Sequence, residues 1–142
     1  MRVLDTNVVS ETMRAQPHAA VLAWLDAQDP SDLWLTAVVA AELMSGVARL
    51  PDGARKQQLA HGVAAMLEQD FAGQVLPFDL AAASVYADLV AQRERSGKPI
   101  GMADAQIAAT CLVHQATLVT RNLKDFEDLG LTLINPWAQA PH

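Results

Sequence analysis

Three acidic residues stand alone in otherwise uncharged stretches of the chain. These residues, with the stretch in which each is the only charged side chain, are Asp5 (3–10), Glu42 (33–48) and Asp104 (99–113). An ionised carboxylate in an apolar setting needs a cation, a hydrogen-bond network or solvent, because its desolvation is costly. If the three met in space, they would form a pocket for a hard divalent ion, since Mg²⁺ prefers oxygen ligands and keeps several waters.

Such an acidic pocket would suit the hydrolysis of a phosphodiester bond, because divalent ions can activate a water and stabilise the leaving oxygen. Each residue alone also has a structural interpretation. Asp5 could cap a helix, Glu42 could pair with a buried arginine, and Asp104 could be a first-turn acid favoured by the helix macrodipole. These interpretations stay open for the single residues, but their joint occurrence favours a functional site.

The predicted elements would bring the three carboxylates to one edge of a sheet. A strand at 2–4 ends at Asp5, and the polar residues that follow it start a helix at 8–14. Glu42 lies on a helix at 37–50 that is apolar nearly all round, so we expect that helix to be buried. Asp104 lies near the start of a helix at 102–114. In open α/β sheets, the carboxyl ends of the strands face the ligand crevice.

Short apolar strands alternate with helices along the whole chain, which predicts an α/β fold: a single domain, an α/β/α sandwich with a mainly parallel sheet of about 4–5 strands. We place the domain at 1–137 and a loose tail at 138–142. The other predicted elements are strands at 33–35, 75–78, 118–120 and 131–134, and helices from Pro17, at 54–70 and from the cap Asp79 to Arg95, with Thr36 capping 37–50.

Composition limits the possible functions. The chain has 142 residues, a net charge of −6 and one cysteine, Cys111, which excludes an internal disulfide framework and a cysteine-based zinc site. That cysteine count suits the reducing cytoplasm, and we expect neither a signal peptide nor a membrane span. The negative charge argues against a surface that grips nucleic acid by charge alone, although bound metal would reverse the local sign of an acidic cluster.

Four segments in order also resemble the PIN-domain family, and their order and spacing are most similar to the VapC toxins of type II toxin–antitoxin pairs. The C-terminal end is similar to the FitB-like branch of that family. The four segments are VLDTNVVSE (3–11), Ala41-Glu42-Leu43 with Gly46, ADAQIAAT (103–110) and Val119-Thr120-Arg121-Asn122 with Asp125-Phe126. The C-terminal end is Ile134-Asn135-Pro136-Trp137.

The resemblance implies an endoribonuclease dependent on Mg²⁺ or Mn²⁺ that cuts RNA, such as tRNA. It also implies a homodimer and a larger complex with a small antitoxin. Asp5, Glu42 and Asp104 match the family's acidic metal-binding and catalytic positions. The fourth position is an aspartate in many members; here it is Asn122, with Asp125 three residues further on, and both remain candidates.

The resemblance also suggests supporting roles. Asp5 and Asp104 would hold the metal, Glu42 would hold metal or help to deprotonate the water, and Asn122 would position a water. The residues expected to support ligands or to contact substrate are Thr6, Asn7, Thr120, Arg121 and Asp125.

Two alternatives remain from the sequence. The first is a PIN-fold RNA-binding or regulatory module with little or no catalytic activity, which the uncharged Asn122 favours. The second is a phosphatase of the haloacid-dehalogenase kind, which also begins with a strand and an aspartate. That class needs a second aspartate where this chain has Asn7, and a lysine for which Lys98 is the only candidate.

Overall fold

A five-stranded parallel sheet forms the centre of the computed structural model, which describes residues 1–138. The predicted tail at 138–142 therefore lies outside the described residues, apart from Ala138. The strand order is β3-β2-β1-β4-β5, and all neighbouring pairs are parallel. The strands are β1 (Arg2–Leu4), β2 (Leu33–Thr36), β3 (Val75–Leu76), β4 (Thr117–Val119) and β5 (Thr132–Ile134).

The first strand lies in the middle of this sheet. β1 pairs with β2 on one side and with β4 on the other, and Leu4 lies opposite Val119. The ladder continues past the strand end, because the Asp5 amide donates to the Val119 carbonyl at 2.9 Å. The chain leaves β1 towards β2 and returns to β4 on the opposite side, so the strand order reverses here. In open parallel sheets, such a reversal opens a crevice at the carboxyl ends of the strands.

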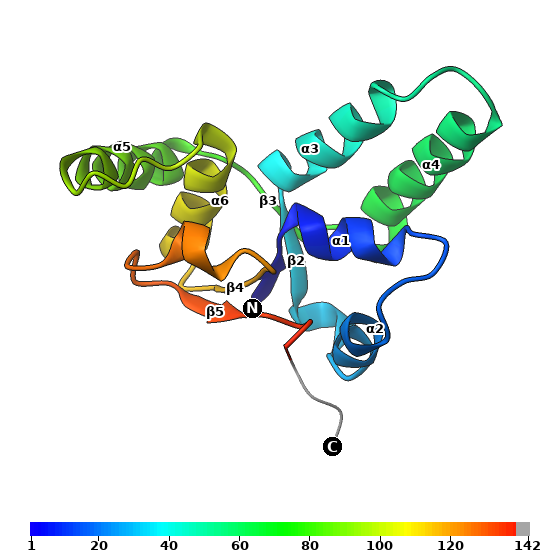
Figure 1. Cartoon of the computed structure of the whole chain (residues 1–142), viewed down its shortest axis with the longest axis horizontal. Coiled ribbons are helices and arrows are strands. Elements are labelled where there is room, and N and C mark those ends of the chain that lie inside the picture. The colour runs from blue at the N-terminus through cyan, green and yellow to red at the C-terminus, as the bar shows by residue number, and fades with distance from the viewer. Residues whose placement is uncertain (139–142) are drawn as a thin grey trace.

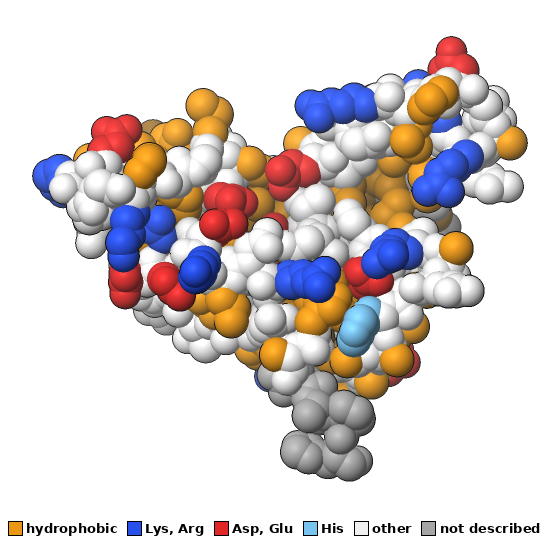
Figure 2. All heavy atoms as spheres, in the orientation of Figure 1, with side chains coloured by type: hydrophobic (Ala, Val, Ile, Leu, Met, Phe, Trp, Pro, Cys, Tyr) orange, Lys and Arg blue, Asp and Glu red, His pale blue; other side chains and the backbone are white. Residues whose placement is uncertain are grey.

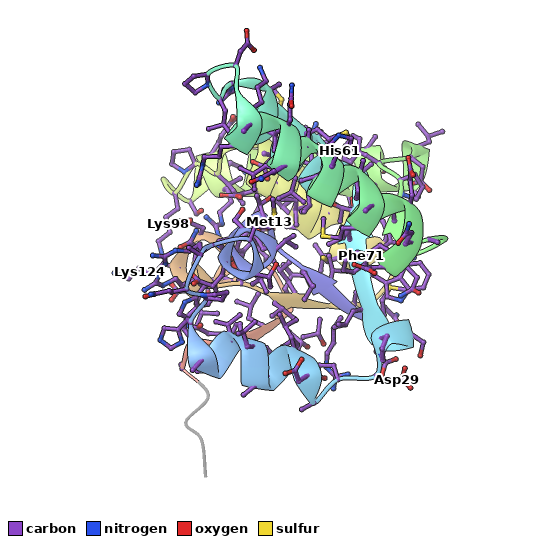
Figure 3. The ribbon with its side chains drawn as sticks, turned by 90° about the vertical axis from the view of Figure 1, so that its right-hand side faces the viewer. Met13, Asp29, His61, Phe71, Lys98 and Lys124 are labelled. Carbon is purple, nitrogen blue, oxygen red and sulfur yellow. The ribbon has the colours of Figure 1, made fainter. Side chains whose placement is uncertain are left out.

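Helices cover both faces of the sheet. Figures 1 and 3 show that α2 lies on one side and that α3 to α6 lie on the other. The helices are α1 (Thr6–Thr12), α2 (Ala19–Asp26), α3 (Ala37–Ala48), α4 (Ala54–Ala65), α5 (Leu80–Arg95) and α6 (Met102–Val113), with 3₁₀ turns η1 (Pro30–Asp32) and η3 (Leu123–Phe126) and a π-helical segment η2 (Met66–Asp70). The predicted α/β/α sandwich with a parallel sheet is confirmed.

Side-chain caps fix where the helices begin. The Thr36 hydroxyl accepts from the Val39 amide at 3.0 Å, and Asp79 accepts from the Ala82 amide at 3.0 Å, so both predicted caps are confirmed. The prediction that Pro17 opens the second helix is wrong. The imidazole of His18 caps that helix by accepting from the Ala20 amide at 3.2 Å, and α2 therefore starts at Ala19, two residues after Pro17.

The core lies between the sheet and the helices. Strand residues such as Leu35 and Leu118 and helix residues such as Val39 and Ile107 are all fully buried, and so is Cys111, as predicted. No helix among residues 1–138 is long and apolar enough to cross a membrane.

The structure corrects the expectation that the helix carrying Glu42 is buried on all sides. On α3 only one stripe is buried, and it includes Val39, Leu43 and Val47. Met44 is 51% exposed and Glu42 is exposed. The prediction failed because an apolar composition does not require burial: exposed surface commonly carries small apolar side chains. The predicted helix at 54–70 is also interrupted, since α4 ends at Ala65 and a π-helical segment follows.

Candidate acidic site at the sheet edge

Asp5 lies at the carboxyl end of the central strand and is almost completely buried, with 4% exposure. One carboxylate oxygen accepts from the Thr6 amide at 2.8 Å. The other accepts from the Thr120 hydroxyl at 2.8 Å and from the Asn7 side-chain amide at 3.4 Å. Three hydrogen bonds from neighbouring protein groups therefore orient this carboxylate.

Thr120 connects the ends of the two neighbouring strands. Its hydroxyl donates to Asp5 and accepts from the backbone amide of Asn122 at 3.1 Å and from the side chain of Asn7 at 3.4 Å. The side-chain oxygen of Asn7 in turn accepts from the Arg121 backbone amide at 3.3 Å. The structure thus brings Asn7 and Thr120 together around Asp5.

Glu42 reaches the same edge from α3. Its Oε1 accepts from the Thr6 hydroxyl at 2.6 Å, so Thr6 contacts two of the acidic residues, through its amide and through its hydroxyl. None of the ion pairs within residues 1–138 includes Glu42. The alternative in which Glu42 pairs with a buried arginine is therefore wrong for the described part of the chain.

Asp104 lies in the first turn of α6 and is half-buried. Burial is the main reason that its pKa rises from the ordinary value of 3.8 to about 6, and the charges of Asp5, Asp125 and Glu42 raise the pKa further. Burial also raises the pKa of Asp5, opposed by the hydrogen bonds from Thr120 and Thr6 and reinforced by Glu42 and Asp125. The four carboxylates therefore share one electrostatic site.

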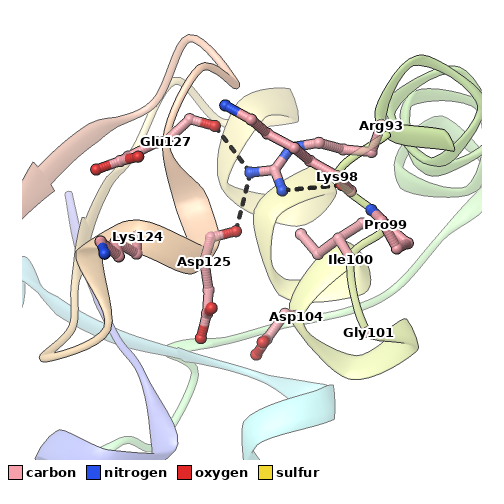
Figure 4. A pocket seen from close by; sticks show the side chains of 9 residues that line it. All are labelled: Arg93, Lys98, Pro99, Ile100, Gly101, Asp104, Lys124, Asp125 and Glu127. Atoms are coloured by element: carbon pink, nitrogen blue, oxygen red, sulfur yellow. Dashed lines mark hydrogen bonds between the residues drawn. The ribbon is translucent and has the colours of Figure 1, made fainter. Parts of the chain in front are cut away.

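The two candidates for the fourth position, Asn122 and Asp125, differ in their surroundings. Asn122 is exposed and contacts the network through its backbone amide, on Thr120. Asp125 lies one turn later, on η3, and its charge acts on both Asp5 and Asp104. In Figure 4 the carboxylates of Asp104 and Asp125 point into the same space. Asp125 therefore adds the negative charge that Asn122 lacks.

Asp104 and Asp125 line a cavity of about 400 Å³, which we call the acidic pocket. Figure 2 shows acidic side chains gathered in the hollow between α6 and α3. Three cationic residues also line the cavity: Arg93, Lys98 and Lys124. No sequence pattern indicated a role for Arg93, because it lies in the charged run 93–95, which resembles a solvated helix end.

Arg121, for which the resemblance implies contact with a phosphate, is exposed beside this network. Its guanidinium lies over the ring of Trp137, 5.1 Å from the centroid, in a cation–π contact. This contact holds the arginine at the C-terminal end of the fold. The guanidinium forms no ion pair with an acidic residue among residues 1–138.

The oxygen ligands of the site suit a hard divalent cation, although they do not by themselves complete its coordination. Asp5, Glu42, Asp104 and Asp125 offer only carboxylate oxygens, and within residues 1–138 no basic side chain forms an ion pair with any of them. In the same described part, no three His, Cys, Asp or Glu side chains lie close enough to hold one ion together. An ion that keeps several of its waters needs fewer direct protein ligands, and Mg²⁺ binds in this way.

The fold and the site define a class of protein: an α/β domain whose parallel sheet places a cluster of carboxylates at its reversal point. The PIN-domain family model matches residues 2–130, and the chain belongs to the PIN-domain family. This membership replaces the haloacid-dehalogenase alternative, and the Lys98 that it required lies instead 3.9 Å from the carboxylate of Asp128.

Individual relatives resemble the chain over almost its whole length. VapC ribonuclease Y4jK of Sinorhizobium fredii is 49% identical over 99% of this chain and 100% of its own length. Toxin FitB of Neisseria gonorrhoeae is 41% identical, covering 96% of this chain and 99% of its own. The solved structure of FitAB bound to an IR36 DNA fragment superposes with a TM-score of 0.92 at 39% identity, covering 100% of this chain and 99% of the other.

Proposed function

We propose that this PIN-domain protein is an endoribonuclease that hydrolyses phosphodiester bonds in RNA and is the toxin of a VapBC-type toxin–antitoxin pair. The observation that carries the proposal is the cluster of four carboxylates at the sheet edge, in which Glu42 and Asp125 raise the pKa of both Asp5 and Asp104 and, within residues 1–138, no basic side chain forms an ion pair with any of the four. The relatives named as a VapC ribonuclease and as toxin FitB, aligned over nearly the whole chain, support the same function.

The activity would depend on Mg²⁺ or Mn²⁺. Asp5 and Asp104 would hold the ion and Glu42 would act on it through a bound water, because these carboxylates supply hard oxygen donors and, within residues 1–138, form no ion pair with a basic side chain. The chemistry supplied by such an ion is the activation of a water and the neutralisation of charge on the phosphate.

The protein groups around the ion have separate tasks. Thr120 and the Thr6 amide fix the orientation of Asp5 and favour its ionised form. Glu42 is exposed and accepts one hydrogen bond, from Thr6 to Oε1, so its other oxygen is available to take a proton from the attacking water. Asp125 would supply the fourth charge, and the Asn122 side chain would position a water.

Cationic side chains at the rim would contact the RNA backbone. Lys98 and Lys124 line the acidic pocket, and Arg121 lies exposed beside the Asp5 network. Basic side chains in these places would bind the phosphates on either side of the bond that is cut, which a protein with a net charge of −6 needs at its site.

The partners follow from the same site. A small antitoxin would silence the enzyme by inserting an arginine among the carboxylates, where it would displace metal or substrate. We also propose a homodimer that assembles with the antitoxin into a larger complex, and we propose the cytoplasm as the compartment in which the enzyme meets RNA.

The decisive experiment is the cleavage of a structured RNA, such as tRNA, by the purified protein in Mn²⁺, in Mg²⁺ and in EDTA. We expect cleavage that requires metal and falls at least a hundredfold in Asp5→Asn, because one ligand loses its charge. Asp26→Asn, on an exposed part of α2 on the far side of the sheet, is the matched control and should keep full activity. Cleavage that persists in Asp5→Asn, or in EDTA, would refute the proposal.

The second candidate function is an RNA-binding module with little catalysis, which Asn122 favours because it brings no charge to the fourth position. The same samples distinguish the two functions. RNA that is bound in Mn²⁺ but remains intact, with the fold preserved, would support the binding module.

A further inference from the structure

Arg93 is a buried cation, 8% exposed, whose partners are backbone carbonyls. Its Nη1 donates to the Lys98 carbonyl at 3.3 Å, and its Nη2 donates to the carbonyls of Asp125 at 3.0 Å and Glu127 at 2.8 Å (Figure 4). None of the ion pairs within residues 1–138 includes it. Burial of a guanidinium is costly unless its donors are satisfied, so these three bonds are what make the position tolerable.

The three carbonyls belong to the two segments that deliver Asp104 and Asp125. Lys98 opens the short segment that runs through Gly101, the N-cap of α6, to Asp104 in the first turn. Asp125 and Glu127 lie in and just after η3. Carbonyls at the end of a helical turn have no partner within it, so a side chain from elsewhere must satisfy them. Arg93 satisfies two carbonyls in and just after η3, and it also binds the Lys98 carbonyl in the segment that leads into α6.

The C-terminal end of α5, which carries Arg93, is closed by backbone hydrogen bonds. At the end of α5, the Lys98 amide donates back to the Arg93 carbonyl at 3.0 Å and the Gly97 amide donates to the Glu94 carbonyl at 3.1 Å. Gly97 has a φ of 72°, which completes a Schellman motif. The Arg93 side chain therefore projects from a helix end whose own geometry is fixed.

We propose that Arg93 is a positioning residue that sets the spacing of Asp104 and Asp125 by bridging the segments that carry them. Arg93 acts through these carboxylates and contacts no reacting group. The significance of their spacing rests on the proposed function, whereas the bridge between the segments does not.

Hydrogen exchange of the metal-free protein tests the bridge directly. Arg93→Ala removes the guanidinium, and Arg93→Lys keeps the charge but cannot donate in a planar fork. In both variants we expect at least tenfold faster exchange in peptides covering 98–104 and 123–127, with no change in 37–48. Arg95→Ala, an exposed arginine in the same helical turn, is the matched control and should leave all these peptides unchanged.

Calorimetric titration with Mn²⁺ in the absence of RNA tests the consequence. Both Arg93 variants should bind Mn²⁺ at least tenfold more weakly than wild type and Arg95→Ala. At saturating Mn²⁺, kcat for RNA cleavage, calculated per folded molecule from the circular-dichroism signal of each variant, should fall while KM for RNA changes less than threefold. Added methylguanidinium should restore part of the Mn²⁺ affinity in Arg93→Ala.

Several results would overturn the proposal: unchanged exchange in both Arg93 variants, faster exchange with unaltered Mn²⁺ affinity, or full recovery in Arg93→Lys, which would mean that charge alone suffices. Loss of folding in both variants would also overturn it, since Arg93 would then serve the whole domain. A wild-type protein that neither binds Mn²⁺ nor cuts RNA would instead refute the proposed function, and hydrogen exchange would still decide the bridge.

Discussion

The surroundings of Asp104 disfavour the charged form of its carboxylate. Its pKa rises from 3.8 to about 6, through burial first and then through Asp5, Asp125 and Glu42. A folded-state pKa above the unfolded one means that the folded state holds its proton to higher pH. The contribution of Asp104 to the free energy of unfolding is therefore fully present below about pH 4 and is lost as the pH rises through about 6. The site is strained by its own charge at neutral pH.

We accordingly expect Asp104→Asn to stabilise the metal-free protein at pH 7. The gain should be about 1 kcal/mol, less than the full pKa difference, because solvent screens a half-exposed carboxylate. At about pH 4 the gain should vanish, since the carboxyl is protonated in both states. Urea unfolding in EDTA at the two pH values measures the difference, with Asp26→Asn as the control. A gain of equal size at both pH values would contradict this account.

At the level of single residues, the sequence predicted which residues lie at the site better than it predicted how they are arranged. Solitary charges identified Asp5, Glu42 and Asp104, and the structure brings all three to one sheet edge, although their roles as ligands stay predictions. The sequence could not separate Asn122 from Asp125, because the answer depends on how η3 is turned. It also gave Arg93 no role, since the three carbonyls that Arg93 binds are known only from the folded backbone.

At the level of elements, α3 is the helix that brings Glu42 to the site, and its start is fixed by the buried hydroxyl of Thr36 on the Val39 amide. Thr36→Ala should lower the free energy of unfolding by about 1 kcal/mol, since an amide of the first turn loses its acceptor. Thr36→Ser, which keeps the hydroxyl, should cost less. Urea denaturation of the two variants makes the comparison, and equal losses would assign the effect to the missing methyl group.

Most elements were predictable because their signals are local. Apolar runs between turn residues gave the strands, and Thr36 and Asp79 marked helix starts that the structure confirms. The errors concern non-local packing: which face of α3 a neighbour covers, and where the helix after Gly53 becomes π-helical. The His18 cap was missed for a chemical reason, because histidine is not among the side chains usually found capping helices.

At the scale of the whole molecule, bound metal should stabilise the fold, because an ion that binds only the folded state shifts the unfolding equilibrium. At a Mn²⁺ concentration one hundred times its Kd, the gain is about 2.7 kcal/mol. For a domain of this size, we expect Tm to rise by roughly 5–10 °C. Calorimetry with and without Mn²⁺ checks this at constant ionic strength.

Asp5→Asn and Asp104→Asn should lose most of that rise, and Asp26→Asn should keep it. An identical shift in Asp5→Asn and wild type would place the bound ion elsewhere on the molecule.

The hydrogen bond between Thr120 and Asp5 joins residues 115 positions apart, and it has a consequence for the timing of synthesis. Asp5 is translated well before the strand that leads to its partner Thr120, because translation follows the order of the sequence. A nascent chain therefore holds the first half of the pocket throughout its own translation and cannot complete it until β4 has emerged. A chain that stops before β4 lacks Thr120 and therefore cannot form the hydrogen bond that orients Asp5 in the acidic site.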